Sequence, residues 1–226
     1  MVKPKEHWRH LALLISILLL FIVAPLAAGV RQGALILNVI AATVLIAGSY
    51  ALFERKRLFV VAVALSAISI VATWLLIASR QHWASLLSRS CVILLIVFFS
   101  VTILGYVLRS GRVTVDKIFA AICVYMLIGY AWTFTYALID ELQPGSFVAL
   151  SATAADDYVA REIQFRYFSF ITLTTVGYGD ILPRSAAART MAVLEAITGQ
   201  IYLTVLVARL VGLHIVHGDS SISRED

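Results

Sequence analysis

Charged side chains are scarce in this chain. Only 14% of its 226 residues are Asp, Glu, Lys or Arg, whereas 61% are hydrophobic. A soluble domain of this length could not bury so much apolar surface, but the interior of a lipid bilayer accommodates it. The formal net charge of +5 does not indicate a nucleic-acid partner, because the basic residues flank long apolar runs and form no polar stripe. The composition therefore predicts a protein embedded in a lipid bilayer.

Cysteines and catalytic motifs are scarce as well. The two cysteines, Cys91 and Cys123, each lie inside an apolar run, and their spacing indicates neither a disulfide nor a zinc site. The sequence contains no glycine-rich phosphate loop, no zinc-binding His-Glu-x-x-His pattern and no nucleophile elbow. His214 and His217 share a helix face, but their place at the end of an apolar run is typical of solvated interface residues. We therefore expect neither an enzyme nor a bound cofactor.

What the chain does have is long apolar runs, and a helix needs roughly 20 apolar residues to cross a bilayer. Six runs reach or approach that length: 11–30, 34–53, 58–78, 91–108, 118–139 and 190–213. A shorter run, 162–173, lies between the last two and is followed by glycine-containing sequence. Non-helical backbone at membrane depth survives only where protein buries it or where it lines water. The sequence predicts an all-α membrane protein of six transmembrane helices, with a re-entrant helix between the fifth and the sixth.

The first run has an alternative interpretation. Lys3, Lys5 and Arg9, followed by an apolar core and Ala27-Ala28, are similar to a secretory signal peptide. Because the run 11–30 is longer than a typical signal core and more membrane helices follow it, we favour a retained helix. Cleavage after Ala28 would leave the remaining topology unchanged, so counting helices does not decide between the two.

Basic residues predict the orientation in the membrane. With the amino terminus in the cytoplasm, 11 of the 18 Lys and Arg residues lie inside, including all four lysines. This bias agrees with the positive-inside rule. We therefore expect a multi-pass protein of the cell membrane with both terminal segments, 1–10 and 214–226, in the cytoplasm. The re-entrant helix then enters from outside.

The most specific motif is Thr-Thr-Val-Gly-Tyr-Gly-Asp at 174–180. Conducting K+ requires oxygen ligands that replace the water shell of the ion, and successive backbone carbonyls aimed at one axis can supply them. Such a backbone needs conformations that glycine adopts without a Cβ clash, which explains glycine at alternate positions, 177 and 179. The Thr175 hydroxyl can add a further ring of oxygens, while the side chains of Val176 and Tyr178 turn away from the axis. The predicted K+-coordinating residues are Thr175, Val176, Gly177, Tyr178 and Gly179.

This segment resembles the signature sequence of the potassium-channel family, and the surrounding sequence resembles that of short prokaryotic-type members. The resemblance implies a homotetramer that conducts K+ passively, with one pore loop per subunit and K+ as the permeant ion. It implies a pore domain at 115–213: an outer helix 118–139, a pore helix 162–173, a filter 174–179 and an inner helix 190–213. Gly199 falls 21 residues after Tyr178, where the family places the hinge glycine of its inner helix.

The resemblance also implies side chains that support the filter, namely Tyr167, Phe168, Thr172, Thr174, Asp180 and Glu195. The family commonly has two pore-helix aromatics, often tryptophans. Because Phe168 has no hydrogen-bond donor, the sequence predicts that Asp180 and Tyr178 lack the brace that an indole would give, and Thr172 is left to reach Tyr178. Glu195 is an acid at membrane depth, which is costly and normally partnered. We favour a partner in or near the pore helix over direct exposure to ions.

Two surfaces of the predicted pore follow from spacing and charge. Helical spacing from Gly199 places Gln200, Leu203, Val207 and Val211 on one face, which we expect to line the cavity and to form any inner gate. The segment 140–180 contains two arginines and six acidic residues. The acidic residues are Asp140, Glu141, Asp156, Asp157, Glu162 and Asp180. An acidic outer vestibule that concentrates cations and an ordinary solvated loop are equally compatible with this excess.

Residues 11–109 have the four-helix layout of a voltage sensor without its arginine repeat. The segment 86–112 contains only Arg89, Arg109 and Arg112, and 19 uncharged residues separate the first two. Arginines that anchor helix ends at the two membrane interfaces explain this pattern better than gating charges do. We expect no steep voltage gating. The 13 residues after position 213 leave no room for a regulatory domain, so we expect control by the inner helix, the filter, lipid or a separate regulatory subunit.

Two other functions are compatible with a pore-like sequence. A transporter-associated subunit can be built on the same pore unit, although such chains usually carry four related units with degenerate filters. A nonconducting membrane subunit could retain the motif. The single intact filter favours a conducting channel over both.

Overall fold

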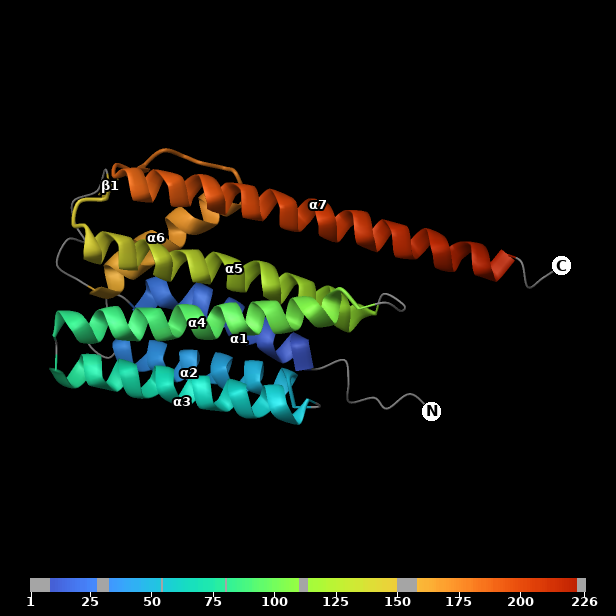
Figure 1. Ribbon diagram of the computed structural model, residues 1–226, viewed down its shortest axis with the longest axis horizontal. Coiled ribbons are helices and arrows are strands. Elements are labelled where there is room, and N and C mark those ends of the chain that lie inside the picture. Colours follow the sequence, from blue (N-terminus) through green and yellow to red (C-terminus); the bar gives the residue numbers. More distant parts are fainter. Residues whose placement is uncertain are drawn as a thin grey trace.

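The computed structural model describes residues 9–27, 33–53, 55–79, 81–109, 114–149 and 158–222. Within these ranges the chain forms helices and one small sheet (Figure 1). In order they are α1 (Arg9–Ala27), α2 (Gly33–Ala51), α3 (Lys56–Ser79), α4 (His82–Val107), α5 (Val115–Leu142), β1 (Phe147–Ala149), α6 (Tyr158–Leu173), β2 (Ile181–Pro183) and α7 (Ala186–Ile222). Helices predominate because every backbone polar group in hydrocarbon must be satisfied within its own segment.

The helices confirm the all-α membrane class, whereas the count of six spans is not established. Among the described residues, five helices are long and apolar enough to cross a membrane: Arg9–Ala27, Lys56–Leu76, His82–Val107, Val115–Leu142 and Ala186–Arg209. In the second predicted span, the described residues include the apolar helix Val39–Ala51, which is shorter than a span.

Three predicted boundaries were too narrow. Helix α4 begins at His82 rather than 91, because the polar side chains of its first turns, including Ser85 and Arg89, are buried against protein. Helix α5 begins at Val115, where the Thr114 side chain caps it by accepting from the Lys117 N–H. Helix α7 runs to Ile222 and so includes most of the predicted tail, since no proline interrupts 214–222.

The helices lie side by side along one direction, and α6 is inserted among them (Figure 1). Helix α4 packs along α5, α1 along α2 and α3 along α4. Side chains from α1, α4 and α5 form the main core, which includes Leu13, Ile17, Leu95, Phe99, Ile103 and Val124. Lipid is as apolar as these side chains, so close van der Waals packing holds the helices together here.

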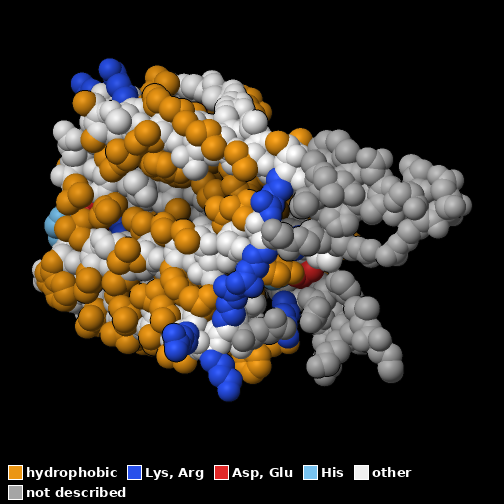
Figure 2. All heavy atoms as spheres, turned by 45° about the vertical axis from the view of Figure 1, so that its right-hand side comes forward, with side chains coloured by type: hydrophobic (Ala, Val, Ile, Leu, Met, Phe, Trp, Pro, Cys, Tyr) orange, Lys and Arg blue, Asp and Glu red, His pale blue; other side chains and the backbone are white. Residues whose placement is uncertain are grey.

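Both ends of the described chain lie at the same end of the bundle. The start of α1 and the end of α7 lie toward the right of Figure 1. Figure 2 shows an orange hydrophobic surface that ends at a band of Lys and Arg side chains. This arrangement agrees with a membrane slab bordered by a basic interface. Lys3, Lys5, Arg31, Arg80, Arg112 and Arg224, which also entered the orientation argument, lie outside the described residues.

Candidate functional site

The pore helix α6 re-enters the bundle rather than crossing it. It starts near the end of the bundle where α5 stops, ends partway along, and the chain then runs back to the same end (Figure 1). This path agrees with a re-entrant helix. It places the segment 174–180 alongside the first half of α7.

A hydrogen-bonded turn directs the chain from α6 into the predicted filter. The Ile171 carbonyl accepts from the N–H groups of Val176, at 2.8 Å, and Gly177, at 3.1 Å. The Thr172 carbonyl accepts from the Thr175 N–H at 2.9 Å. These nested bonds form a Schellman motif, which ends a helix with one residue in the left-handed conformation. That residue is Thr175, with φ of 60°.

Left-handed residues alternate along the filter. The φ angle is 60° at Thr175, 54° at Gly177 and 79° at Gly179, while Val176 and Tyr178 between them do not have positive φ. Alternation of the two hands turns successive peptide groups so that their carbonyls face one side, whereas in a strand they alternate. Gly177 and Gly179 thus adopt the conformations that the motif predicts. Thr175 is β-branched, and holding it at positive φ costs on the order of 1–3 kcal/mol.

A two-stranded sheet holds the carboxyl-terminal end of the predicted filter. Strand β2 directly follows Asp180 and pairs antiparallel with β1, with Phe147 opposite Pro183 and Ala149 opposite Ile181. The Ser146 carbonyl accepts from the Arg184 N–H at 2.7 Å. The filter is therefore held between the Schellman turn at one end and this sheet at the other. The sequence did not predict the sheet, because each strand has only three residues and its partner lies more than 30 positions away.

Helix α7 meets the predicted filter at Gly199 and Gln200. A Cβ on Gly199 would stand 2.4 Å from the Leu173 carbonyl oxygen, so only glycine permits this approach. The Gln200 Nε2 donates to Thr175 Oγ1 at 3.5 Å. Further along, Leu203 and Val207 are exposed in the single chain. The side chain of Val211 lies outside the described residues.

Comparison with known proteins agrees with this geometry. A family model described as "Ion channel" matches residues 148–213. The chain is 30% identical over 104 residues to protein LctB of Bacillus caldotenax, an alignment that covers 45% of this chain and 75% of that protein. It is 33% identical over 63 residues to potassium channel protein kcv of Paramecium bursaria Chlorella virus 1, covering 28% and 67% respectively. The chain belongs to the potassium-channel family.

Another relative shares a shorter stretch. Two-pore potassium channel 4 of Arabidopsis thaliana is 40% identical over 45 residues, which is 20% of this channel and 16% of the plant protein. The channel therefore aligns with a small part of that relative's length. No solved structure gives a significant match. Helices α1–α5 lie outside the residues that the family model covers.

The outer filter has a side-chain contact that the sequence analysis missed. Phe168 supplies no indole donor, but the Tyr167 hydroxyl makes a side-chain hydrogen bond to Asp180 that the sequence analysis did not foresee. The Ile181 N–H also donates to Asp180 Oδ1 at 3.1 Å. The donor is a phenol at 167 rather than an indole at 168. No hydrogen bond joins Thr172 to Tyr178 among the described residues, and the Thr174 hydroxyl bonds to the Phe170 carbonyl.

Phe168 contributes packing rather than a hydrogen bond. It is buried in an aromatic cluster behind the filter with Tyr136, Phe147 and Phe165. Its ring meets Tyr136 edge-on at 5.0 Å and Phe147 at 5.5 Å between centroids. Edge-to-face pairs of this kind contribute about 0.5–1.5 kcal/mol each beyond their buried area. The cluster joins α5, β1 and α6 and also contacts Ile181 at the start of β2.

Glu195 lies on α7 with its side chain fully buried. Ser169 Oγ of α6 is 2.5 Å from Glu195 Oε1, and the Tyr136 hydroxyl of α5 donates to Oε2. The partner predicted in or near the pore helix is thus Ser169, and Tyr136 was not foreseen. The Glu195 carboxyl group therefore links α5, α6 and α7 at one point.

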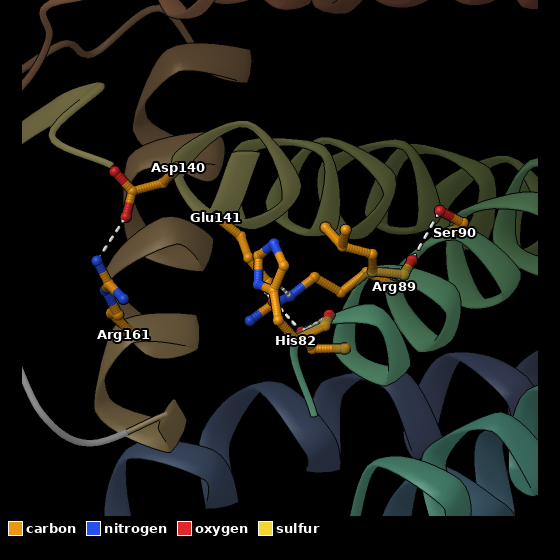
Figure 3. A network of polar contacts seen from close by, with 8 residues as sticks. His82, Arg89, Ser90, Asp140, Glu141 and Arg161 are labelled. Atoms are coloured by element: carbon orange, nitrogen blue, oxygen red, sulfur yellow. Dashed lines mark hydrogen bonds and ion pairs between the residues drawn. The ribbon is translucent and has the colours of Figure 1, made fainter. Parts of the chain in front are cut away.

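Three of the four described acids that were counted toward an outer vestibule are paired with arginines. Figure 3 shows Asp140 with Arg161 and Glu141 with Arg89; the closest atoms are 2.7 Å and 2.8 Å apart. Glu162 lies 3.5 Å from Arg166, one turn later on α6. The excess of six acids over two arginines therefore overstates the free negative charge. Asp156 and Asp157 lie outside the described residues.

The interpretation of Arg89 as an interface anchor needs correction. Arg89 is 8% exposed and donates from Nε to Glu141 Oε2 of α5, while Ser85 donates to the other carboxylate oxygen. His82 lies 3.3 Å from the same carboxylate. Arg89 thus fastens the amino-terminal part of α4 to the carboxyl-terminal end of α5 (Figure 3). The sequence could not show this because its partner lies 52 positions away.

Arg166 is a pore-helix residue whose contacts the sequence analysis missed. It is 5% exposed, donates to the Leu20 carbonyl of α1 at 3.4 Å, and stacks over the Tyr130 ring at 5.2 Å. Its spacing of four residues from Glu162 was the available signal. Through Arg166 and the edge-to-face pair of Phe21 with Phe170 at 4.9 Å, α1 packs directly against the helix that carries the filter.

Proposed function

We propose that this chain is one subunit of a homotetrameric, K+-selective channel that conducts K+ passively through a central pore. The observation that carries the proposal is the alternation of left-handed residues at 175, 177 and 179 directly after a re-entrant helix. In this conformation the carbonyls of successive filter residues can replace the hydration shell of K+. The carboxyl end of α6 adds a partial negative charge directed toward the cavity below. The expected K+ ligands are Thr175, Val176, Gly177 and Tyr178, with Gly179 completing the filter.

A flux assay tests this function directly. The purified channel is placed in vesicles loaded with KCl and diluted into NaCl, with a proton carrier and a pH-sensitive dye reporting K+ efflux. The proposal predicts rapid efflux, and none when NaCl replaces KCl inside the vesicles and the external cation is impermeant. Equal efflux rates for K+ and Na+ would contradict the proposed selectivity. No signal for either ion, from protein shown to be folded, would favour a nonconducting subunit.

A fourfold assembly is expected because one filter strand supplies one side of an ion cage, and closed cyclic symmetry completes it. In the single chain, Val176 is 51% and Tyr178 is 73% exposed, so the filter has large faces left for neighbouring subunits to cover. Native mass measurement in detergent should give four times the 24.8 kDa chain mass. A monomer or dimer as the species that conducts would contradict the proposal.

The face of α7 below the filter should line the cavity. Gln200 contacts Thr175, and Leu203 and Val207 are exposed in the single chain, as a cavity-lining face requires. Single cysteines at Gln200, Leu203, Val207 and Val211, in a background lacking Cys91 and Cys123, should react with a cytoplasmic thiol reagent and reduce the K+ current. Cysteine at Tyr202, which is buried and donates to the Ala121 carbonyl, is the control on another face. Reaction at 202 with protection of the other four would contradict the assignment.

Voltage should change the current only weakly. Steep gating requires several charges per subunit that cross the field, each yielding about 2.3 kcal/mol per 100 mV. The middle of α4 carries no charge, and Arg89 is paired with Glu141. We expect nearly linear currents in symmetric K+. Arg89→Gln and Glu141→Gln should lower the thermal stability of the channel, with a coupling of about 0.5–3 kcal/mol in the double-mutant cycle. A steep conductance–voltage curve that Arg89→Gln abolishes would instead make α4 a voltage sensor.

A further inference from the structure

The hydroxyl groups around Glu195 have fewer hydrogens than the acceptors that surround them. Ser169 Oγ lies 2.8 Å from the Gly129 carbonyl oxygen and 2.5 Å from Glu195 Oε1. A hydroxyl has one hydrogen, so Ser169 cannot donate fully to both acceptors. The Tyr136 hydroxyl gives its single hydrogen to Glu195 Oε2. If Glu195 were ionised, the cluster would be one hydrogen short, and two acceptors would face the Ser169 oxygen.

A protonated Glu195 supplies the missing hydrogen. Its carboxyl O–H donates to Ser169 Oγ, Ser169 donates to the Gly129 carbonyl, and Tyr136 donates to the second carboxyl oxygen. Each short contact then has one donor and one acceptor. The surroundings agree, because Glu195 and Ser169 are both 0% exposed and an unpaired buried charge is costly. Within the described part of the chain, the ion pairs of Lys, Arg and His involve other acids.

We propose that Glu195 is a positioning residue that works as a neutral carboxylic acid and clamps the pore helix α6 between α5 and α7. The clamp acts on conduction through the filter that α6 carries, and in this respect it rests on the proposed function. Ser169 lies six residues before Thr175 on the helix that ends in the Schellman turn. One turn further along α7, the Leu173 carbonyl of α6 packs closely against Gly199. Helix α7 therefore holds α6 at two points, of which Glu195 is the polar one.

Infrared difference spectroscopy tests the protonation state without relying on conduction. The spectrum of the wild-type channel minus that of Glu195→Gln, at neutral pH, should contain the C=O stretching band of a protonated carboxylic acid, shifted downward in D2O. The matched control is Asp140→Asn, because Asp140 is paired with Arg161. Its difference spectrum should show carboxylate bands only. Carboxylate bands for Glu195 would overturn the proposal.

The same variants test the positioning role. Glu195→Gln keeps an N–H donor for Ser169 and an oxygen for Tyr136, so its K+ flux and selectivity should stay within about twofold of wild type. Glu195→Leu leaves Ser169 and Tyr136 without partners, and its flux or K+/Na+ permeability ratio should fall about tenfold or more. If the leucine variant does not assemble, Ser169→Ala and Tyr136→Phe each remove one hydroxyl and should give intermediate losses.

The outcomes separate this proposal from the proposed function. Unchanged conduction in Glu195→Leu, or equal losses in the Gln and Leu variants, would overturn the clamp in a channel that conducts. A wild-type protein that carries no K+ current would defeat the proposed function, whereas the infrared band and the thermal stability of the variants would still decide whether Glu195 is a neutral clamp.

Discussion

Replacing Gly177 or Gly179 with alanine should abolish K+ flux. Both residues have φ in the left-handed region, at 54° and 79°, where a Cβ is strained whatever space surrounds it. No atom lies within 4 Å of the added Cβ in either case, so the expected loss comes from the backbone and not from a clash within the subunit. An alanine that returns φ to negative values turns a carbonyl away from the ion axis. Flux in vesicles should fall to background for both variants.

Gly145→Ala is the matched control. Gly145 has φ of 81° and no atom within 4 Å of a built Cβ, but it lies in the turn before β1 and is not part of the segment 174–180. A similar backbone strain there should lower stability by about 1 kcal/mol while leaving K+ selectivity intact. If Gly177→Ala and Gly145→Ala conduct equally well, the segment 174–180 is not the selectivity filter.

Gly199→Ala should disrupt the joint between the inner helix and the pore helix. The new Cβ would stand 2.4 Å from the Leu173 backbone oxygen and 3.0 Å from its Cδ1. The oxygen belongs to the end of α6 and also accepts from the Tyr125 hydroxyl, so it cannot move freely. Overpacking of this kind costs about 1–3 kcal/mol per site. We expect a lower melting temperature of the assembled channel and a large loss of flux.

Gly105→Ala controls for the substitution itself. Gly105 lies within α4 with nothing within 4 Å of a built Cβ, so alanine there should be neutral or slightly stabilising. The sequence assigned Gly199 to a hinge, and the two roles give different results. A hinge predicts altered open probability with unchanged stability and unit conductance. That outcome for Gly199→Ala would contradict the packing role.

The left-handed backbone at Gly177 and Gly179 could be predicted from the sequence because a contiguous motif encodes it. Gly177 and Gly179 reveal left-handed backbone directly, and the short apolar run before them indicates a re-entrant helix. The positive φ of Thr175 was not predicted, because threonine rarely adopts this conformation and so gives no signal for it in the sequence. Its conformation follows from the Schellman turn at the end of α6, which is a property of backbone hydrogen bonds.

Side-chain pairs between residues far apart in the chain could not be predicted from the sequence. Glu195 was recognised as an acid that needs a partner, but only the packing of three helices identifies Ser169 and Tyr136. Arg89 was placed at a membrane interface because its charge lies at a helix end, yet Glu141 of α5 neutralises it. Charges at helix ends look alike in sequence whether they meet lipid headgroups or another helix.

The most direct test of a K+-selective pore is the reversal potential of single channels in a planar bilayer, with KCl on one side and NaCl on the other. The carbonyl geometry at Thr175, Gly177 and Gly179 predicts a reversal potential displaced far toward the K+ equilibrium potential. Exchanging the two solutions should reverse its sign. A reversal potential near zero, with unit currents of similar size in both directions, would contradict the account.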